Sequence, residues 1–184
     1  MFVQTEATPN PNSLKFLPGK SVSLIGPVEI IEIRKTNNEL IRNIISIDWV
    51  KGVFLSDNFI SVNKHNEYEW EDLKHIIISF INDYFSNGNE SVISNIEDTK
   101  EIDTSTVEGQ IIKILETKIR PAVARDGGDI KFKEFKDGIV RVELQGACSG
   151  CPSAALTLKQ GVQNLLCHYI PEVREVEAVW KKFL

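Results

Sequence analysis

The 184-residue chain lacks the marks of several large protein classes. No apolar run approaches the roughly 20 residues that a membrane-spanning helix needs, although apolar residues make up an ordinary 42% of the sequence. The net charge is −5 and no basic stripe is present, whereas a nucleic-acid binder needs a basic surface that neutralises phosphates. We therefore expect neither a membrane nor a nucleic acid among its partners.

The chain has few cysteines and no recognisable targeting signal, and both observations indicate in which cellular compartment the protein is expected. Three cysteines do not make a disulfide framework in a chain of this size, and a CxxC pair in a reducing compartment more often binds metal or exchanges electrons. Residues 1–6 show neither the regions of a secretion signal nor the Arg-rich character of an organelle presequence. We expect a bacterial cytoplasmic protein, with a processed mitochondrial matrix protein as the alternative.

Charge and composition divide the chain into two domains and a tether. Residues 86–106 contain one Lys against five acidic residues, hence a net charge of −4, and they break the apolar periodicity. Such a polar, self-repelling segment cannot bury enough apolar surface to offset its chain entropy. We therefore predict a first domain over residues 1–86, a flexible acidic linker over 87–106 and a second domain over 107–184.

In the first domain, the spacing of apolar residues predicts a small sheet covered by helices. Asn38 is expected to cap the first of these helices. The aromatic stripe of the second helix is expected to lie in the core. The predicted elements are strands over 13–17 and 28–33, a helix over 39–47, a hairpin over 52–62 around an Asp-Asn turn and a helix over 69–85.

The second domain is predicted to have the order α-β-β-α-β, so that both domains are small α/β sandwiches of the α+β class. Its first helix presents an apolar face from Val107 to Ile119, is started afresh or kinked at Pro121, and ends at Gly127. A hairpin follows, with one polar face on each strand. The next elements are a helix over 152–169, which should bury Leu158, Val162, Leu165, Leu166 and Tyr169, and a last strand over 176–180.

The most informative feature of the chain is Cys148-Ser149-Gly150-Cys151, which directly precedes Pro152. A strand is expected to end just before this motif and a helix to begin just after it. Free N–H groups and the helix dipole stabilise anions there, which should lower the pKa of both thiols. Iron-sulfur and structural zinc sites use about four protein ligands, so one chain supplies half a site.

Three functions are compatible with this pair of thiolates. A thioredoxin-like dithiol oxidoreductase also places CxxC between a strand and a helix, but inside a β-α-β unit, whereas here a hairpin precedes the motif. A zinc-bridged structural dimer would draw two ligands from each chain, since no other CxxC or His pair is present. An iron-sulfur cluster at a dimer axis would likewise receive two thiolates per subunit. The apolar setting offers nothing for acid-base catalysis, so we do not expect an enzyme.

Seven segments along the chain form a pattern that covers nearly all of it. They are residues 8–16 (TPNPNSLKF), 52–54 (GVF), 59–62 (FISV), 119–123 (IRPAV), 125–130 (RDGGDI), 146–153 (GACSGCPS) and 169–173 (YIPEV). With these segments in this order, the sequence resembles the Nfu proteins, which are iron-sulfur cluster carriers with a NifU-like C-terminal domain. The resemblance implies a homodimer that holds a [4Fe-4S] cluster, or alternatively a [2Fe-2S] cluster, between two subunits and passes it to apo-proteins. It also implies upstream cluster-assembly partners and an N-terminal domain that engages clients.

A site with only two thiolates per chain suits a carrier. Cys148 and Cys151 are the expected cluster-binding and metal-binding residues. In a surface loop at a dimer interface they would leave one edge of the cluster accessible. We therefore expect client thiolates to displace them one at a time, with the dimer separating as the cluster leaves.

Other residues could be taken for ligands, and most have a simpler explanation. Cys167 is expected on the polar face of its helix, outside the site. His65, His75 and His168 lack ligand spacing, and His168 should lie about 25 Å from the CxxC motif at 1.5 Å per helical residue. Residues 8–12 contain two prolines and predict a rigid turn rather than a direct client contact.

Two carboxylates and an arginine lie around the Gly-Gly pair. Asp126 and Asp129 resemble paired catalytic carboxylates, but their setting predicts a turn and capping role. Arg125 either offsets the negative charge of a bound cluster or is simply solvated.

Overall fold

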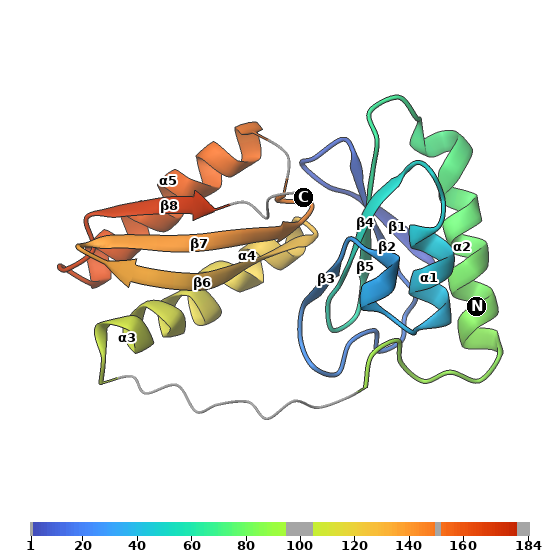
Figure 1. Ribbon diagram of the computed structural model, residues 1–184, viewed down its shortest axis with the longest axis horizontal. Coiled ribbons are helices and arrows are strands. Elements are labelled where there is room, and N and C mark those ends of the chain that lie inside the picture. The colour runs from blue at the N-terminus through green and yellow to red at the C-terminus, as the bar shows by residue number, and fades with distance from the viewer. Residues whose placement is uncertain (1, 95–104, 150–151, 180–184) are drawn as a thin grey trace. The chain divides into compact units, whose positions relative to one another are not determined.

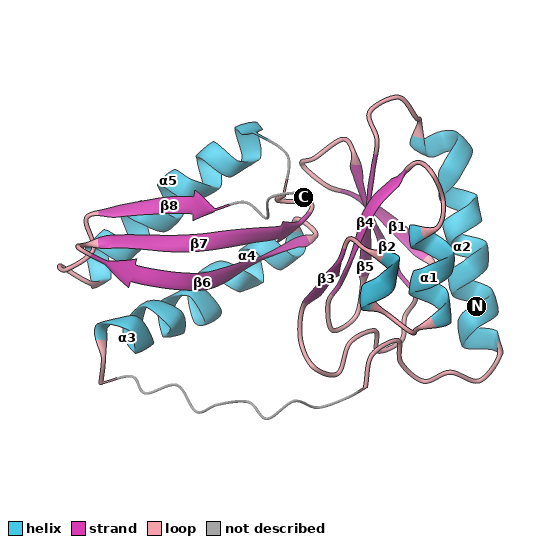
Figure 2. Ribbon diagram, viewed as in Figure 1, coloured by secondary structure: helices cyan, strands magenta, loops and turns pink. Residues whose placement is uncertain are grey.

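The computed structural model describes residues 2–94, 105–149 and 152–179, which belong to two compact units, 1–97 and 98–184 (Figure 1). Each unit packs helices against one face of a sheet, as Figure 2 shows. The predicted α+β class is confirmed. Within the described part of the chain, no helix combines the length and the apolar character needed to cross a membrane.

The first unit contains a five-stranded antiparallel sheet in the order β1-β2-β5-β4-β3. Apolar side chains of its two helices and of alternate strand positions form one core, in which Phe16, Ile41 and Ile77 are fully buried. The elements are β1 (Gln4–Ala7), β2 (Ser13–Leu17), β3 (Val28–Ile30), the 3-10 turn η1 (Ile33–Lys35), α1 (Glu39–Ile45), β4 (Val50–Leu55), β5 (Ile60–Lys64) and α2 (Trp70–Ser86).

Most of the elements predicted for this unit are present. The strand expected over 28–33 is shorter, because the chain turns into η1 after Ile30. Asn38 caps α1 as predicted: its side chain accepts a hydrogen bond from the Ile41 N–H at 3.2 Å. The aromatic stripe of α2 packs on the core, with Trp70 edge-on to Phe16 at a ring distance of 6.2 Å.

Residues 87–94 pack onto the first unit, so the predicted linker begins too early. Val92 is buried, and its N–H donates to the Val22 carbonyl at 2.9 Å. The Leu24 N–H in turn donates to the Ile93 carbonyl at 2.9 Å. Two apolar residues within a polar stretch are enough to anchor it to a neighbouring backbone. Residues 95–104 of the predicted linker lie outside the described residues, and its last residue, Thr106, caps the next helix by accepting a hydrogen bond from the Gly109 N–H at 3.0 Å.

The second unit has the predicted order α-β-β-α-β, and its strands form a sheet in the order β6-β7-β8. Ile130, Val142 and Leu144 lie on the face of this sheet that shares a core with the helices. The elements are α3 (Val107–Ile114), the π-helical turn η2 (Leu115–Ile119), α4 (Arg120–Arg125), β6 (Gly128–Lys136), β7 (Ile139–Gly146), α5 (Pro152–Tyr169) and β8 (Glu175–Val179).

The helix before the hairpin changes its winding just ahead of Pro121. The Arg120 N–H donates to the Leu115 carbonyl, five residues back, instead of the usual four. Pro121 has no N–H to donate, and its ring would clash with the carbonyl four residues earlier. The wider π turn accommodates the proline, which confirms the predicted discontinuity.

The helix that follows the CxxC motif joins two adjacent strands that run in the same direction. β7 pairs with β8 in parallel, with Val140 opposite Val176, and α5 is the crossover between them. The motif therefore does lie inside a β-α-β unit, and the topological argument against a thioredoxin-like oxidoreductase was wrong. The alternation of apolar residues identifies strands but carries no information on their direction of pairing.

The buried face of α5 is only partly as predicted. Val162 and Leu166 are almost fully buried, but Tyr169 is 49% exposed. Its ring lies under the Lys118 ammonium group, 5.0 Å from the ring centroid. An aromatic ring at a helix end can pack on a long side chain instead of entering the core.

Candidate metal centre

Cys148 lies in the turn that follows β7, immediately before the part of the chain that leads into α5. Its side chain is 7% exposed and belongs to the core of the second unit. α5 begins at Pro152, so the predicted helix start directly after the motif is confirmed. Cys151, the second predicted ligand, lies outside the described residues, and its role as a ligand stays a prediction.

The turn that carries Cys148 is closed by its own backbone. The Ser149 N–H and hydroxyl both donate to the Gly146 carbonyl, at 3.1 and 2.8 Å. Gly146 has a φ of +66°, a conformation that side chains with a Cβ rarely adopt. The sequence between β7 and the motif therefore specifies a tight turn that fixes the backbone at Cys148.

The Gly127-Gly128 pair packs directly against this turn. The Ala147 N–H donates to the Gly127 carbonyl at 3.1 Å, and Gly127 has a φ of +82°. A Cβ on Gly128 would lie 2.6 Å from the Cys148 sulfur and 2.6 Å from the Gln145 carbonyl oxygen. Gly127 is thus needed for its conformation and Gly128 for its lack of a side chain.

Sequence reasoning did not identify Gly128 as a neighbour of the thiol, although a signal was available. Asp137 and Gly138 both have positive φ angles and form the turn of the β6-β7 hairpin. If residues of the two strands are paired one by one from this turn, Gly128 lies opposite Gly146. The register shifts once, between Phe132 and Glu134.

Asp129 is a buried ion-pair partner rather than a turn residue. Its side chain accepts two hydrogen bonds from Arg120, from Nε at 2.8 Å and from Nη2 at 3.1 Å. Asp129 is 2% exposed and lies on β6, next to Gly128. Asp126, by contrast, is exposed where α4 ends. The predicted turn role therefore holds for Asp126 but was wrong for Asp129, whose partner lies nine residues earlier.

The remaining candidates are Arg125 and Cys167. Arg125 is exposed, and its action on a bound cluster stays a prediction. Cys167 is half-buried and packs against the core, so its predicted position on the polar face of α5 was wrong. Among the described residues, no group of three or more His, Cys, Asp or Glu side chains is arranged to hold a metal ion.

Comparison with known proteins assigns both units. The family described as scaffold protein Nfu/NifU N terminal matches residues 3–88, and the NifU-like domain family matches residues 111–177. The human protein named NFU1 iron-sulfur cluster scaffold homolog, mitochondrial, is 45% identical over 188 residues, which span 97% of this chain and 72% of that protein. The chain belongs to the Nfu family.

A plant member of the Nfu family gives a similar result. The Arabidopsis thaliana protein named NifU-like protein 4, mitochondrial, is 44% identical over 186 residues, which span 96% of this chain and 65% of that protein. The NifU-like match includes both cysteines of the motif, the Gly-Gly pair and the Arg120–Asp129 ion pair. The resemblance that the sequence carries is therefore confirmed at the level of the family.

Proposed function

We propose that this chain is a carrier of iron-sulfur clusters, not an enzyme, and that Cys148 and Cys151 of two subunits hold one [4Fe-4S] cluster. The observation that carries the proposal is the CxxC sequence between the end of β7 and the start of α5 in a NifU-like domain. A [4Fe-4S] cluster takes four thiolates, so two chains would complete the site. A [2Fe-2S] cluster is the alternative cargo.

Transfer by thiolate exchange needs no electron source. Each step forms one iron–sulfur bond to a client cysteine and breaks one iron–sulfur bond to Cys148 or Cys151. The released thiolate takes up the proton that the client thiol gave up, so charge balances and iron keeps its oxidation state. We expect the dimer to separate when the last bond to one subunit breaks.

The burial of Cys148 changes one part of this account. An open surface loop was expected, yet the side chain of Cys148 is only 7% exposed and lies over Gly128. The cargo can bind only if the turn presents this sulfur outward. We therefore propose that loading and release both include a movement of residues 147–149, which makes the stability of this turn part of the carrier function.

The partners follow from the same proposal. Apo-proteins with free cysteines would accept the cluster, assembly proteins would supply it, and the N-terminal domain would engage one or both. Both relatives described above are named mitochondrial, so we favour the mitochondrial matrix over the bacterial cytoplasm that was first expected.

Anaerobic reconstitution with iron and sulfide tests the proposal. We expect a brown dimer with broad absorption near about 400 nm. Replacing either Cys148 or Cys151 by Ala should abolish cluster retention and leave the circular dichroism spectrum unchanged, whereas Cys167→Ala should retain the cluster.

Two other outcomes would identify the remaining alternatives. Efficient reduction of insulin disulfides without iron would indicate a thioredoxin-like dithiol oxidoreductase, a function that the β-α-β setting of the motif now permits. A colourless dimer with bound zinc would indicate a structural zinc site.

A further inference from the structure

One ion pair joins the two ends of residues 120–129, the segment that contains Gly128 and packs against Cys148. Arg120 begins α4, and Asp129 is the second residue of β6, so the pair spans the whole connection through Gly127 and Gly128. Its two hydrogen bonds, at 2.8 and 3.1 Å, join the fork of the guanidinium to both carboxylate oxygens. A guanidinium that makes two hydrogen bonds to one carboxylate fixes the orientation of that carboxylate as well as its distance.

The ion pair acts on the thiol through a short path. Asp129 is bonded to Gly128, whose Cα faces the Cys148 sulfur, and the preceding carbonyl of Gly127 accepts the Ala147 N–H. If Asp129 moved, Gly128 would move with it, and the contact surface of the Cys148 side chain would change. The ion pair and the Cys148 sulfur are thus connected through two residues, Asp129 and Gly128.

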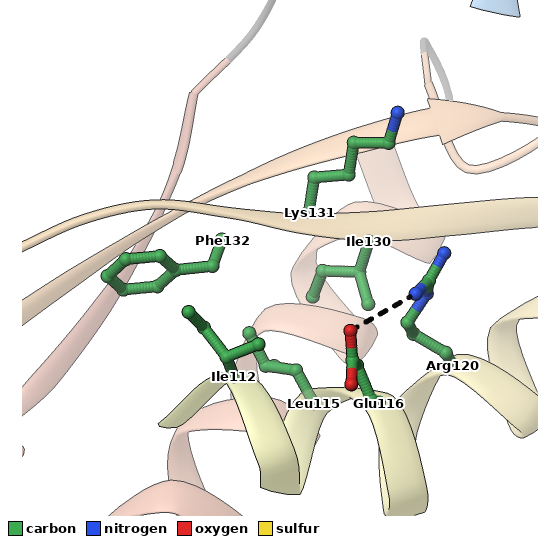
Figure 3. A pocket seen from close by; sticks show the side chains of 7 residues that line it. All are labelled: Ile112, Leu115, Glu116, Arg120, Ile130, Lys131 and Phe132. Carbon is green, nitrogen blue, oxygen red and sulfur yellow. Dashed lines mark ion pairs between the residues drawn. The ribbon is translucent and has the colours of Figure 1, made fainter. Parts of the chain in front are cut away.

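Arg120 is itself held on the helix side. Its Nη1 lies 3.7 Å from a Glu116 carboxylate oxygen, an ion pair visible in Figure 3. Both residues line a pocket of about 240 Å³ between η2 and β6, beside Leu115 and Ile130. Among the described residues, no cysteine lines this pocket. The pocket that Arg120 lines is therefore separate from the space around the Cys148 sulfur.

We propose that Arg120 and Asp129 are positioning residues of the cluster site, and that their two hydrogen bonds set how long the cargo is retained. The inference rests on the proposed function and extends it. Neither residue supplies a bond to iron. Residues that orient metal ligands from outside commonly change metal affinity by about 10–100-fold when they are replaced.

The first experiment measures the thiol without any cluster. In a chain that keeps Cys148 as its only cysteine (Cys151→Ser, Cys167→Ser), the rate of alkylation by iodoacetamide is compared with and without Arg120→Lys. The lysine side chain would keep the charge but could not make two parallel bonds. We expect alkylation to be severalfold faster, because the turn opens more often. Arg120→Gln is the second variant should Arg120→Lys fail to fold.

The second experiment measures retention. After anaerobic reconstitution of the otherwise unchanged chain, loss of the 400 nm band to an iron chelator should be about tenfold faster in Arg120→Lys than in the unsubstituted protein. All rates are taken at a temperature where circular dichroism shows each variant folded, so a general loss of stability does not contribute.

Arg141→Lys is the matched control. Arg141 also bonds two carboxylates, Glu134 and Glu177, but it lies on β7 five residues before the strand ends at Gly146, about 17 Å along the strand. This change should leave both rates unaltered. Equal rates in the Arg120 variants and the unsubstituted protein would overturn the inference. If the unsubstituted protein binds no cluster at all, the proposed function fails, while the alkylation rates still decide the role of the ion pair.

Discussion

Two turns of this chain, one in each unit, are fixed in opposite ways. Residues 8–12 are fixed by polar side chains: Thr8 donates to the Asn10 carbonyl at 2.9 Å, and Lys64 donates to the Asn12 side chain at 3.2 Å. Residues 146–149 are fixed by backbone hydrogen bonds, with one more from the Ser149 hydroxyl, and by glycines that leave room. The first turn depends on side chains to close it, whereas in the second the missing side chain of Gly128 lets the Cys148 sulfur pack against the backbone.

The difference gives the two turns different tolerances to substitution. In the first turn, loss of a side chain removes hydrogen bonds and lowers the stability of the unit. In the second, a side chain added at Gly128 would meet the Cys148 sulfur, and we expect it to displace the thiol and prevent cluster binding. The first three of the following predictions each test one half of this contrast, the fourth concerns neither turn, and all are arranged by expected size.

Gly128→Ala should have the largest effect. The new Cβ would lie 2.6 Å from both the Cys148 sulfur and a backbone oxygen of Gln145, and the backbone oxygen cannot rotate away. Overpacking of this kind costs about 1–3 kcal/mol of unfolding free energy. Cluster content after reconstitution should fall to near zero while the protein stays folded at low temperature. Gly161→Ala, where a Cβ meets no described atom within 4 Å, is the control and should keep full cluster content.

Lys64→Met should destabilise the first unit without touching the cluster. Lys64 is 4% exposed and donates to the Asn12 side chain and to the Tyr68 carbonyl at 2.6 Å. Leaving such buried acceptors unsatisfied costs about 1–3 kcal/mol. Chemical denaturation should report this loss, and cluster content should be unchanged. A variant that unfolds normally but no longer binds the cluster would contradict the division of roles between the two turns.

Trp70→Phe should have a smaller effect on the same turn. The Trp70 indole N–H donates to the Pro11 carbonyl at 3.1 Å, and Phe would keep much of the packing against Phe16 while losing this hydrogen bond. We expect a loss of about 1 kcal/mol in unfolding free energy. No measurable loss would mean that the indole donor does not hold the turn.

The smallest effect concerns a partly exposed carboxylate, Glu32, which belongs to neither turn. Hydrogen bonding and attraction to Lys35, with a lesser contribution from Arg34, lower the pKa of Glu32 from its usual 4.5. A lowered pKa stabilises the fold above the unfolded value and loses that contribution as the pH falls through the folded value. An NMR titration should place the Glu32 midpoint below 4.5, and Lys35→Met should raise it. A midpoint unaffected by Lys35→Met would refute the assigned cause.

The elements with strong periodicity could be predicted from the sequence. The apolar residues of α2 recur at helical spacing, Asn38 precedes α1, and Pro152 starts α5 after the motif. Helical spacing, an N-cap and a proline at a helix start each depend only on neighbouring residues, so the sequence was enough to predict them. β1 was missed because all four of its residues are exposed and carry no apolar alternation.

The features that depend on tertiary pairing could not be predicted in the same way. The parallel direction of β8 follows from the path of α5 over the sheet. The Asp129–Arg120 pair depends on how the chain turns between α4 and β6, and a nine-residue separation gives no periodic signal. Cys167 follows the packing of α5, although polar neighbours in sequence pointed the other way.

Native mass spectrometry of the anaerobically loaded protein tests the central claim most directly. It counts subunits, iron and sulfide in one species. We predict a single mass equal to two chains plus one [4Fe-4S] unit, and bare single chains once a client has removed the cluster. An intact cluster on a single chain, with no added thiol, would contradict the account.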